Sequence, residues 1–145
     1  MLFATGVAPR GGTAKRWSDL DITPTAGAVD RNGQLALVWE NYEFGQRDGT
    51  AQYQVSVTLA KNRTLAGRVA ATIVGALASL ARIDQTDDRV AMTFDRTTAH
   101  APAFVDHVTL SLGDTPHGSY TLTLQVTDRV SGKTVTRTRD FMIRD

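Results

Sequence analysis

The chain has 145 residues, of which 41% are hydrophobic and 21% are charged, and this composition is typical of one folded globular domain rather than of a disordered chain. Sixteen Lys and Arg residues against 15 Asp and Glu residues give a formal net charge of +1, which argues against a nucleic-acid-binding function. Cysteine is absent, so disulfides, thiolate catalysis and cysteine-ligated metal centres are excluded. The sequence also lacks an apolar run long enough for a membrane-spanning helix.

Residues 1–16 are predicted to form a flexible lead-in, because residues 6–15 are rich in glycine, alanine and proline. A single β-sandwich domain is expected from Trp17 to Asp145. The opening residues lack the basic region and the long apolar region of a signal peptide. We therefore expect either a cytoplasmic protein or a mature or truncated product.

Four segments alternate apolar and polar side chains with a period of two, which is typical of strands buried on one face. They are Tyr53–Leu59, Val90–Phe94, Val108–Leu112 and Tyr120–Val126, and a hairpin turn after Asp128 leads to a further strand over residues 134–143. Strands with one wet face belong to antiparallel sheets. With turn residues at short intervals, the pattern predicts an all-β fold, an Ig-like or fibronectin-like antiparallel sandwich of seven or eight strands.

The segment Leu35–Phe44 differs from the other strands because it carries large apolar groups on both parities. Leu35, Leu37 and Trp39 share one face, whereas Val38 and Tyr42 share the other with Phe44. We expect this strand to be central in its sheet, or to have its outer face covered by another part of the chain.

Residues 66–83 allow two interpretations. Their alanines favour a helix, and Val69, Ile73, Leu77 and Leu80 form an apolar stripe at helical spacing. Ile73, Leu77 and Ile83 also share a strand parity, so one or two strands remain open. Such a helix would be buried, or would contact a membrane or a partner through the close approach that small residues permit.

Potential metal ligands and acids show no spacing that is typical of a site. The three histidines are expected in or beside solvated loops, and the acidic turn lacks a calcium-loop pattern. Glu40 and Glu43 lie on opposite strand parities, so they do not form a catalytic pair. No nucleophile elbow or phosphate-binding loop occurs. We predict no enzymatic activity, no cofactor, no metal and no small-molecule substrate. The potential metal ligands are His100, His107, His117, Asp84, Asp87 and Asp88.

Asn62-Arg63-Thr64 matches the acceptor pattern for N-glycosylation. Three-residue matches of this kind are frequent by chance, so the pattern alone assigns no modification.

Aromatic and basic residues supply the candidate interface. Aromatic side chains are most often core residues, but they also anchor protein interfaces, and the strand around Trp39 is apolar on both sides. The last strand is rich in arginine, which either guards a solvated sheet edge or forms a docking surface for an acidic partner. The candidate interface residues are Trp17, Trp39, Tyr42, Phe44, Arg137 and Arg139.

Several segments resemble the C-terminal β-rich domain of bacterial proteins named for a GWxTD motif. They are Trp17-Ser18-Asp19-Leu20, the aromatic strand Leu35–Phe44, Tyr53–Leu59, and the final hairpin, His117–Gly132 with Thr138–Ile143. The GWxTD motif itself is missing, so nothing tied to that motif carries over. The resemblance implies an Ig-like sandwich in a bacterial envelope protein, in the cell envelope or periplasm, with no catalytic residue to assign.

We therefore expect a non-catalytic structural or protein-binding module that acts as a subunit or docking domain of a larger bacterial assembly. Its partners would be other protein subunits. One alternative is an accessory subunit of a membrane-bound, energy-transducing complex, with peripheral membrane contact through residues 69–81 or through the flexible N-terminus. The other is a metal- or carbohydrate-binding domain that uses the histidines and aromatic residues.

Overall fold

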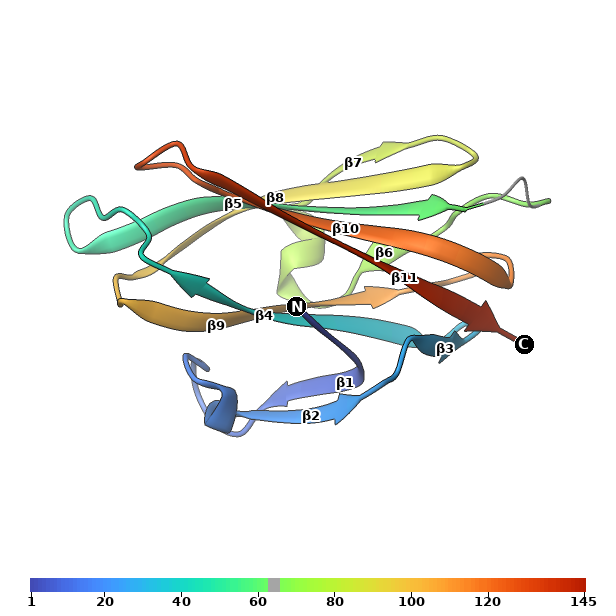
Figure 1. Ribbon diagram of the computed structural model, residues 1–145, viewed down its shortest axis with the longest axis horizontal. Helices are drawn as coiled ribbons and strands as arrows, with labels where there is room; N and C mark the ends of the chain where they lie inside the picture. The colour runs from blue at the N-terminus through green and yellow to red at the C-terminus, as the bar shows by residue number, and fades with distance from the viewer. Residues whose placement is uncertain (63–65) are drawn as a thin grey trace.

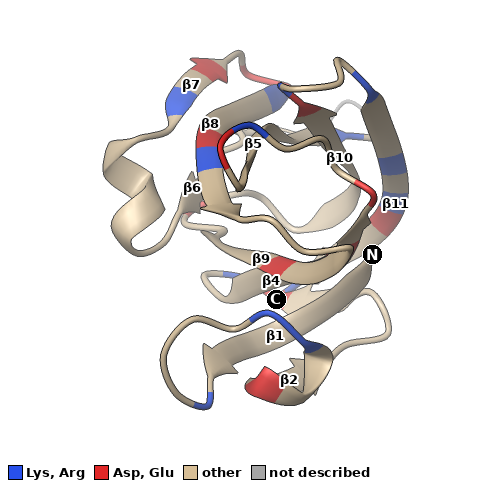
Figure 2. Cartoon of the chain, turned by 90° about the vertical axis from the view of Figure 1, so that its left-hand side faces the viewer, with Lys and Arg blue, Asp and Glu red and all other residues tan. Residues whose placement is uncertain are grey.

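The computed structural model describes residues 1–62 and 66–145, which form a sandwich of two sheets (Figure 1). One sheet has the order β2-β1-β4-β9-β6, and the other has the order β3-β11-β10-β5-β8-β7. Figure 2 shows the first sheet below the second, with β11 at one side and β7 at the other. The strands are β1 (Leu2–Pro9), β2 (Leu20–Pro24), β3 (Ala28–Asp30), β4 (Gln34–Tyr42), β5 (Thr50–Lys61), β6 (Thr72–Ile73), β7 (Arg82–Gln85), β8 (Arg89–Ala99), β9 (Ala103–Ser111), β10 (Gly118–Asp128) and β11 (Thr134–Arg144), with short 3-10 helices η1 (Trp17–Asp19) and η2 (Ala76–Ser79).

The predicted all-β, two-sheet architecture is confirmed. Every pair of neighbouring strands is antiparallel except β3 with β11, and burial alternates along β5 and β10 as the sequence pattern predicts. The described residues form 11 strands rather than seven or eight. The prediction missed β1, β2 and β3, whereas β6 and β7 fall within residues 66–83, where one or two strands were left open.

The N-terminal prediction was wrong for the first nine residues. Strand β1 pairs with β2 and with β4, and Phe3 and Ala4 are fully buried. The Phe3 ring packs edge-on against Phe141 of the opposite sheet, with 5.9 Å between the ring centres. Burial of these apolar side chains outweighs the weak strand signal of a glycine- and alanine-containing segment.

The outer face of β4 is covered, as its two apolar parities predicted. Val38 is fully buried there in a second cluster with Leu20 and Val105. The chain that follows β1 lies over this face, and the Val105 amide donates a 2.8 Å hydrogen bond to the carbonyl of Lys15. This cover leaves the inner face of β4 to pack in the main core.

Of the two interpretations of residues 66–83, the helix was wrong and the pair of strands is confirmed, because the segment is extended through Ile73 and forms β6, η2 and β7. Val69, Ala71 and Ile73 alternate into the core and are almost fully buried. Gly67 and Gly75 have φ values of 92° and 90°, which a helix cannot contain. No helix of the described residues is long or apolar enough to cross a membrane.

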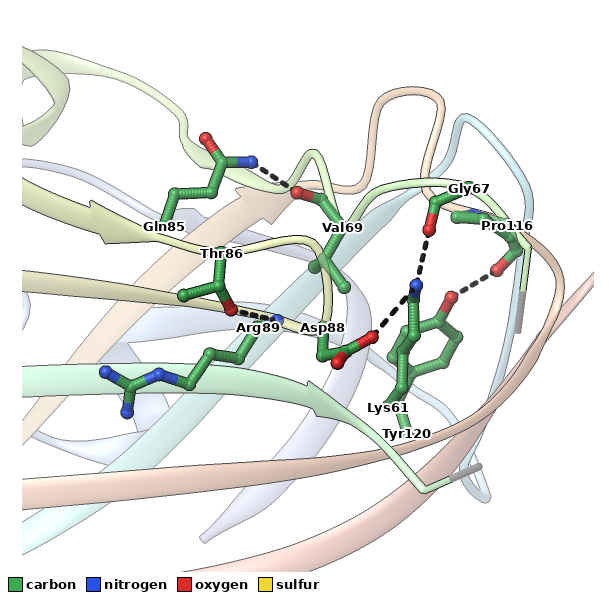
Figure 3. Close-up of polar contacts among 9 residues, drawn as sticks. All are labelled: Lys61, Gly67, Val69, Gln85, Thr86, Asp88, Arg89, Pro116 and Tyr120. Carbon is green, nitrogen blue, oxygen red and sulfur yellow. Dashed lines mark hydrogen bonds and ion pairs between the residues drawn. The ribbon is translucent and has the colours of Figure 1, made fainter. Parts of the chain in front are cut away.

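Side chains from neighbouring strands hold this segment in its extended course (Figure 3). The Lys61 ammonium bonds to the carbonyl of Gly67, and the Gln85 amide bonds to the carbonyl of Val69. A Cβ atom at Gly67 would lie 2.7 Å from Pro116, so glycine is required by space as well as by φ. Hydrogen bonds to strands distant in the sequence therefore replace the local bonds of a helix.

In the N-glycosylation pattern Asn62-Arg63-Thr64, residues 63 and 64 lie outside the described part of the chain.

A buried polar contact joins the two sheets. Asp106 of β9 faces the opposite sheet, where it accepts a 2.7 Å hydrogen bond from the Tyr53 hydroxyl and a 2.7 Å bond from the Arg96 guanidinium. Burial raises the pKa of Asp106, whereas the charge of Arg96 opposes that shift. Burial also raises the pKa of Tyr53, so this hydroxyl remains a donor. We call these three residues the inter-sheet clamp.

We predict that Asp106→Asn lowers the free energy of unfolding by about 3 kcal/mol, because it leaves the largely buried Arg96 charge without its carboxylate. Asp95→Asn is the matched control, because it breaks the exposed Asp95–Arg129 pair and is expected to cost less than about 1 kcal/mol. Urea unfolding measures both values. Equal losses in the two variants would contradict a stabilising role for the buried pair.

Candidate functional site

Strand β4 has an unpaired edge over its second half. Strand β1 pairs with β4 only from Ala36 to Val38. The amide of Glu43 donates to the carbonyl of Pro102, in register with the β4–β9 ladder. In an antiparallel pair only every second residue of a strand bonds to its neighbour, so the odd-numbered residues of β4 bond to β9. The backbone groups of Glu40 and Tyr42 therefore face away from β9. Within the described residues, no strand pairs with these outward-facing groups. This half of β4 is therefore a sheet edge.

Strand β11 has an unpaired edge over its first half. Strand β3 pairs only with Met142–Arg144. The Asp128 amide donates to the carbonyl of Lys133 at the hairpin end, so the odd-numbered residues of the following strand bond to β10. The backbone groups of the even-numbered Thr136 and Thr138 therefore point away from β10. No strand of the described chain pairs with them. The two sheets thus both present open edges.

A groove of about 450 Å³ lies between these two edges, and we call it the edge groove. Inward-facing residues of β4 and β10 form its apolar lining, and the β10–β11 hairpin supplies basic side chains. Its lining residues are Met1, Trp17, Trp39, Glu40, Asn41, Tyr42, Glu43, Phe44, Leu124, Val126, Asp128, Lys133, Val135 and Arg137.

Asn41 is a buried amide in this lining. Its Oδ1 accepts a 3.0 Å hydrogen bond from Trp39 Nε1, and because the indole can only donate, this contact fixes the orientation of the amide. Asn41 Nδ2 has no hydrogen-bond partner among the described residues. A buried donor without a partner lowers the stability of the folded protein. The wall of the groove therefore contains one hydrogen-bond donor that the described residues leave unused.

Glu40 organises the aromatic residues at the mouth of the groove. Its Oε2 accepts a 2.6 Å bond from the Tyr42 hydroxyl and a 3.1 Å bond from Trp17 Nε1. These two bonds lower the pKa of Glu40, and the bond from Tyr42 raises the pKa of that hydroxyl. Two partly exposed aromatic rings are therefore held side by side around one carboxylate.

Asp128 closes the end of the groove by joining the loop after β4 to the β10–β11 turn. Its carboxylate accepts bonds from the Gly45 amide at 2.7 Å, the Val130 amide at 2.9 Å and the Ser131 hydroxyl at 2.6 Å. Burial alone would raise the pKa of Asp128, but these bonds together lower it. A Cβ atom at Gly45 would lie 2.9 Å from Val130, so the close approach requires glycine.

The edge groove gathers five of the six candidate interface residues. Trp17, Tyr42 and Arg137 lie at its surface, whereas Trp39 is buried in its wall. Phe44 is half-buried and packs against Phe104 and Tyr53 in the core. The sixth residue, Arg139, lies on the Phe3 ring at 4.6 Å from its centre. Their role in an interface stays a prediction.

Sequence reasoning did not single out Asn41 or Asp128. Both continue the buried parity of their strands, Asn41 after Leu37 and Trp39 and Asp128 after Leu124 and Val126. The period of two was therefore a signal of their burial, and their polar character concealed it.

The potential metal ligands remain separate. His100 contacts the carbonyl of Phe44 at 3.2 Å, His117 lies 3.3 Å from Asp145, and burial lowers the pKa of His107 on β9. In the acidic turn, Asp84 pairs with Arg89 and Asp88 with Lys61. Across the described residues, no group of three or more histidine or acidic side chains is placed to hold a metal ion.

No protein-family model matches the chain, and no curated protein matches it.

We predict that Asp128→Asn destabilises the protein by about 1–3 kcal/mol at neutral pH, because an amide nitrogen cannot accept the bonds made to one carboxylate oxygen. The folded-state pKa of Asp128 lies below its ordinary value of 3.8, so the stabilisation is present above that value and is lost as the pH falls through the folded-state pKa. Urea unfolding at a series of pH values should therefore show the two proteins converging in acid.

Asp48→Asn, at an exposed turn residue before β5, controls for the loss of one negative charge. A constant difference between wild type and Asp128→Asn down to strongly acidic pH would contradict this account of the groove end.

Proposed function

We propose that the chain is a non-catalytic protein-binding module that acts as a docking domain or subunit of a larger bacterial assembly. The edge groove is the observation that carries this proposal. It combines an apolar lining, exposed aromatic side chains and two lines of backbone donors and acceptors that pair with no strand of the described chain, and these features together suit a polypeptide partner.

The aromatic mouth of the groove supplies the expected anchors. Tyr42 is 62% exposed and Val135 is 50% exposed, and Trp17 lies beside them at the same opening. Tyr42 and Trp17 are already held by Glu40, so ordering them on binding costs little conformational entropy.

The finer fold assignment and the location belong to the same proposal. The segments that resemble the GWxTD-type domain fall on η1 with the start of β2, on β4, on β5 and on the β10–β11 hairpin. An Ig-like or fibronectin-like relationship is compatible with the two-sheet architecture. A bacterial envelope location follows from that resemblance alone. The membrane-complex alternative receives less support, because Val69, Ala71 and Ile73 of its contact segment are buried in the core.

Carbohydrate binding is a second candidate that one observation favours. Trp17 and Tyr42 flank the Glu40 carboxylate at the groove mouth, and aromatic faces beside a hydrogen-bonding carboxylate suit a sugar ring. Titration with oligosaccharides while recording tryptophan fluorescence tests this candidate. Saturable quenching by one oligosaccharide, lost in Tyr42→Ala, would favour it over the protein-binding function.

For the protein-binding function, we predict that Tyr42→Ala weakens partner retention by about tenfold or more, because an interface anchor of this type contributes about 2 kcal/mol. The measurement is capture by immobilised protein from an extract of the source cells, followed by titration of the retained protein. Leu80→Ala is the matched control, since Leu80 is 64% exposed on the η2–β7 side, away from the groove. A partner that both variants retain as well as wild type does would place the interface elsewhere.

A further inference from the structure

The first half of β11 combines a free backbone edge with unpaired positive charge. Thr136 and Thr138 direct their backbone groups outward, Arg137 and Arg139 alternate with them along the strand, and Lys133 lies in the turn just before it. Figure 2 shows the basic bands along β11. Among the described residues, none of these three cations has a carboxylate within ion-pair distance, whereas Arg144 at the paired end of β11 bonds to Asp30.

The Arg137 guanidinium lies at the edge itself. Its Nη1 donates a 3.0 Å hydrogen bond to the carbonyl of Thr136, one of the groups that would bond to an added strand. The backbone amide of an added strand would donate to the Thr136 carbonyl in place of Arg137. The guanidinium would then lie beside the side chains of the added strand. A carboxylate there would give Arg137 the ion pair that it lacks among the described residues.

A second copy of this chain is a poor occupant of the edge. Antiparallel pairing of two β11 strands would bring Arg137 and Arg139 of both copies close together, and like charges on paired strands are destabilising. The same charges guard the edge against self-association. An acidic occupant removes this repulsion.

The opposite wall determines which edge an acidic occupant would choose. Glu40 and Glu43 are on the β4 side of the groove, whereas Lys133 and Arg137 are on the β11 side. A negatively charged segment is repelled by the first wall and attracted by the second. Val135, beside Arg137 and half-exposed, offers an apolar contact on the same strand face.

We propose that β11 is the docking strand, and that it accepts an extended acidic segment of a partner protein as an additional strand paired with Thr136 and Thr138. The side chains of the acidic segment that face the groove are an apolar group, which contacts Val135, and two carboxylates, which pair with Arg137 and Arg139. This inference rests on the proposed protein-binding function and specifies the partner's chemistry.

The test uses a short capped peptide with threonine on one parity and valine, glutamate and glutamate on the other. Backbone amide NMR of the full chain during titration should show shifts at Thr136 and Thr138 and slower hydrogen exchange there. We expect Arg137→Glu to weaken binding by about tenfold or more. Thr136→Pro should abolish binding yet fold, because the amide of Thr136 faces away from the β10 ladder.

Two further peptides keep the test independent of how the variants fold. A lysine-for-glutamate peptide tests the charge, and a backbone N-methylated peptide tests strand pairing; wild-type protein should bind neither. Equal binding of either control peptide, no binding of the acidic peptide, or a wild-type dimer abolished by Thr136→Pro would overturn the proposal. If partner capture depends on Tyr42 but survives Thr136→Pro and Arg137→Glu, the proposed function stands and strand addition at β11 does not.

Discussion

A strand edge inside a folded protein must be paired, covered or guarded, and this constraint governs how the open side of the sandwich is built. The outermost strands, among them β3, β6 and β7, are short, which limits the backbone that they expose. Strands β4 and β11 are long, and each loses its neighbour partway along its length. The edge groove exists because both interruptions fall on the same side of the molecule.

Two buried carboxylates link distant strands of the sandwich by different electrostatic means. Asp106 is held in the core by Arg96 and Tyr53, where loss of water is the dominant effect and its pKa is raised. Asp128 accepts several amide and hydroxyl bonds at the groove end, where these bonds dominate and its pKa is lowered. The first carboxylate links β9 to β5 and β8, and the second links the loop after β4 to the hairpin. The end of the groove is therefore closed by the contacts of Asp128, which do not depend on an occupant.

The sequence alone predicts the strands that contribute whole faces to the core, because side-chain alternation is a local property. It fails where long-range contacts decide the conformation. The alanines of residues 66–83 favour a helix, but Val69, Ala71 and Ile73 fill the core only as an extended segment. The aromatic residues of the groove were identified from the sequence, whereas Asn41 and Asp128 were not, although both continue the buried parity of their strands. The bond from Gly45 to Asp128 could not be predicted, because it joins residues far apart in the sequence.

The charges around the groove supply selectivity that the backbone edges alone do not have. A free edge attracts any extended chain through its backbone groups, which carry no sequence information. The cations of β11 and the carboxylates of β4 add that information, since they oppose pairing with a second copy and direct a charged segment to one edge. In the unoccupied protein, the Arg137 guanidinium satisfies the carbonyl of Thr136. The same residue thus protects the edge when it is empty and would recognise a carboxylate when it is filled.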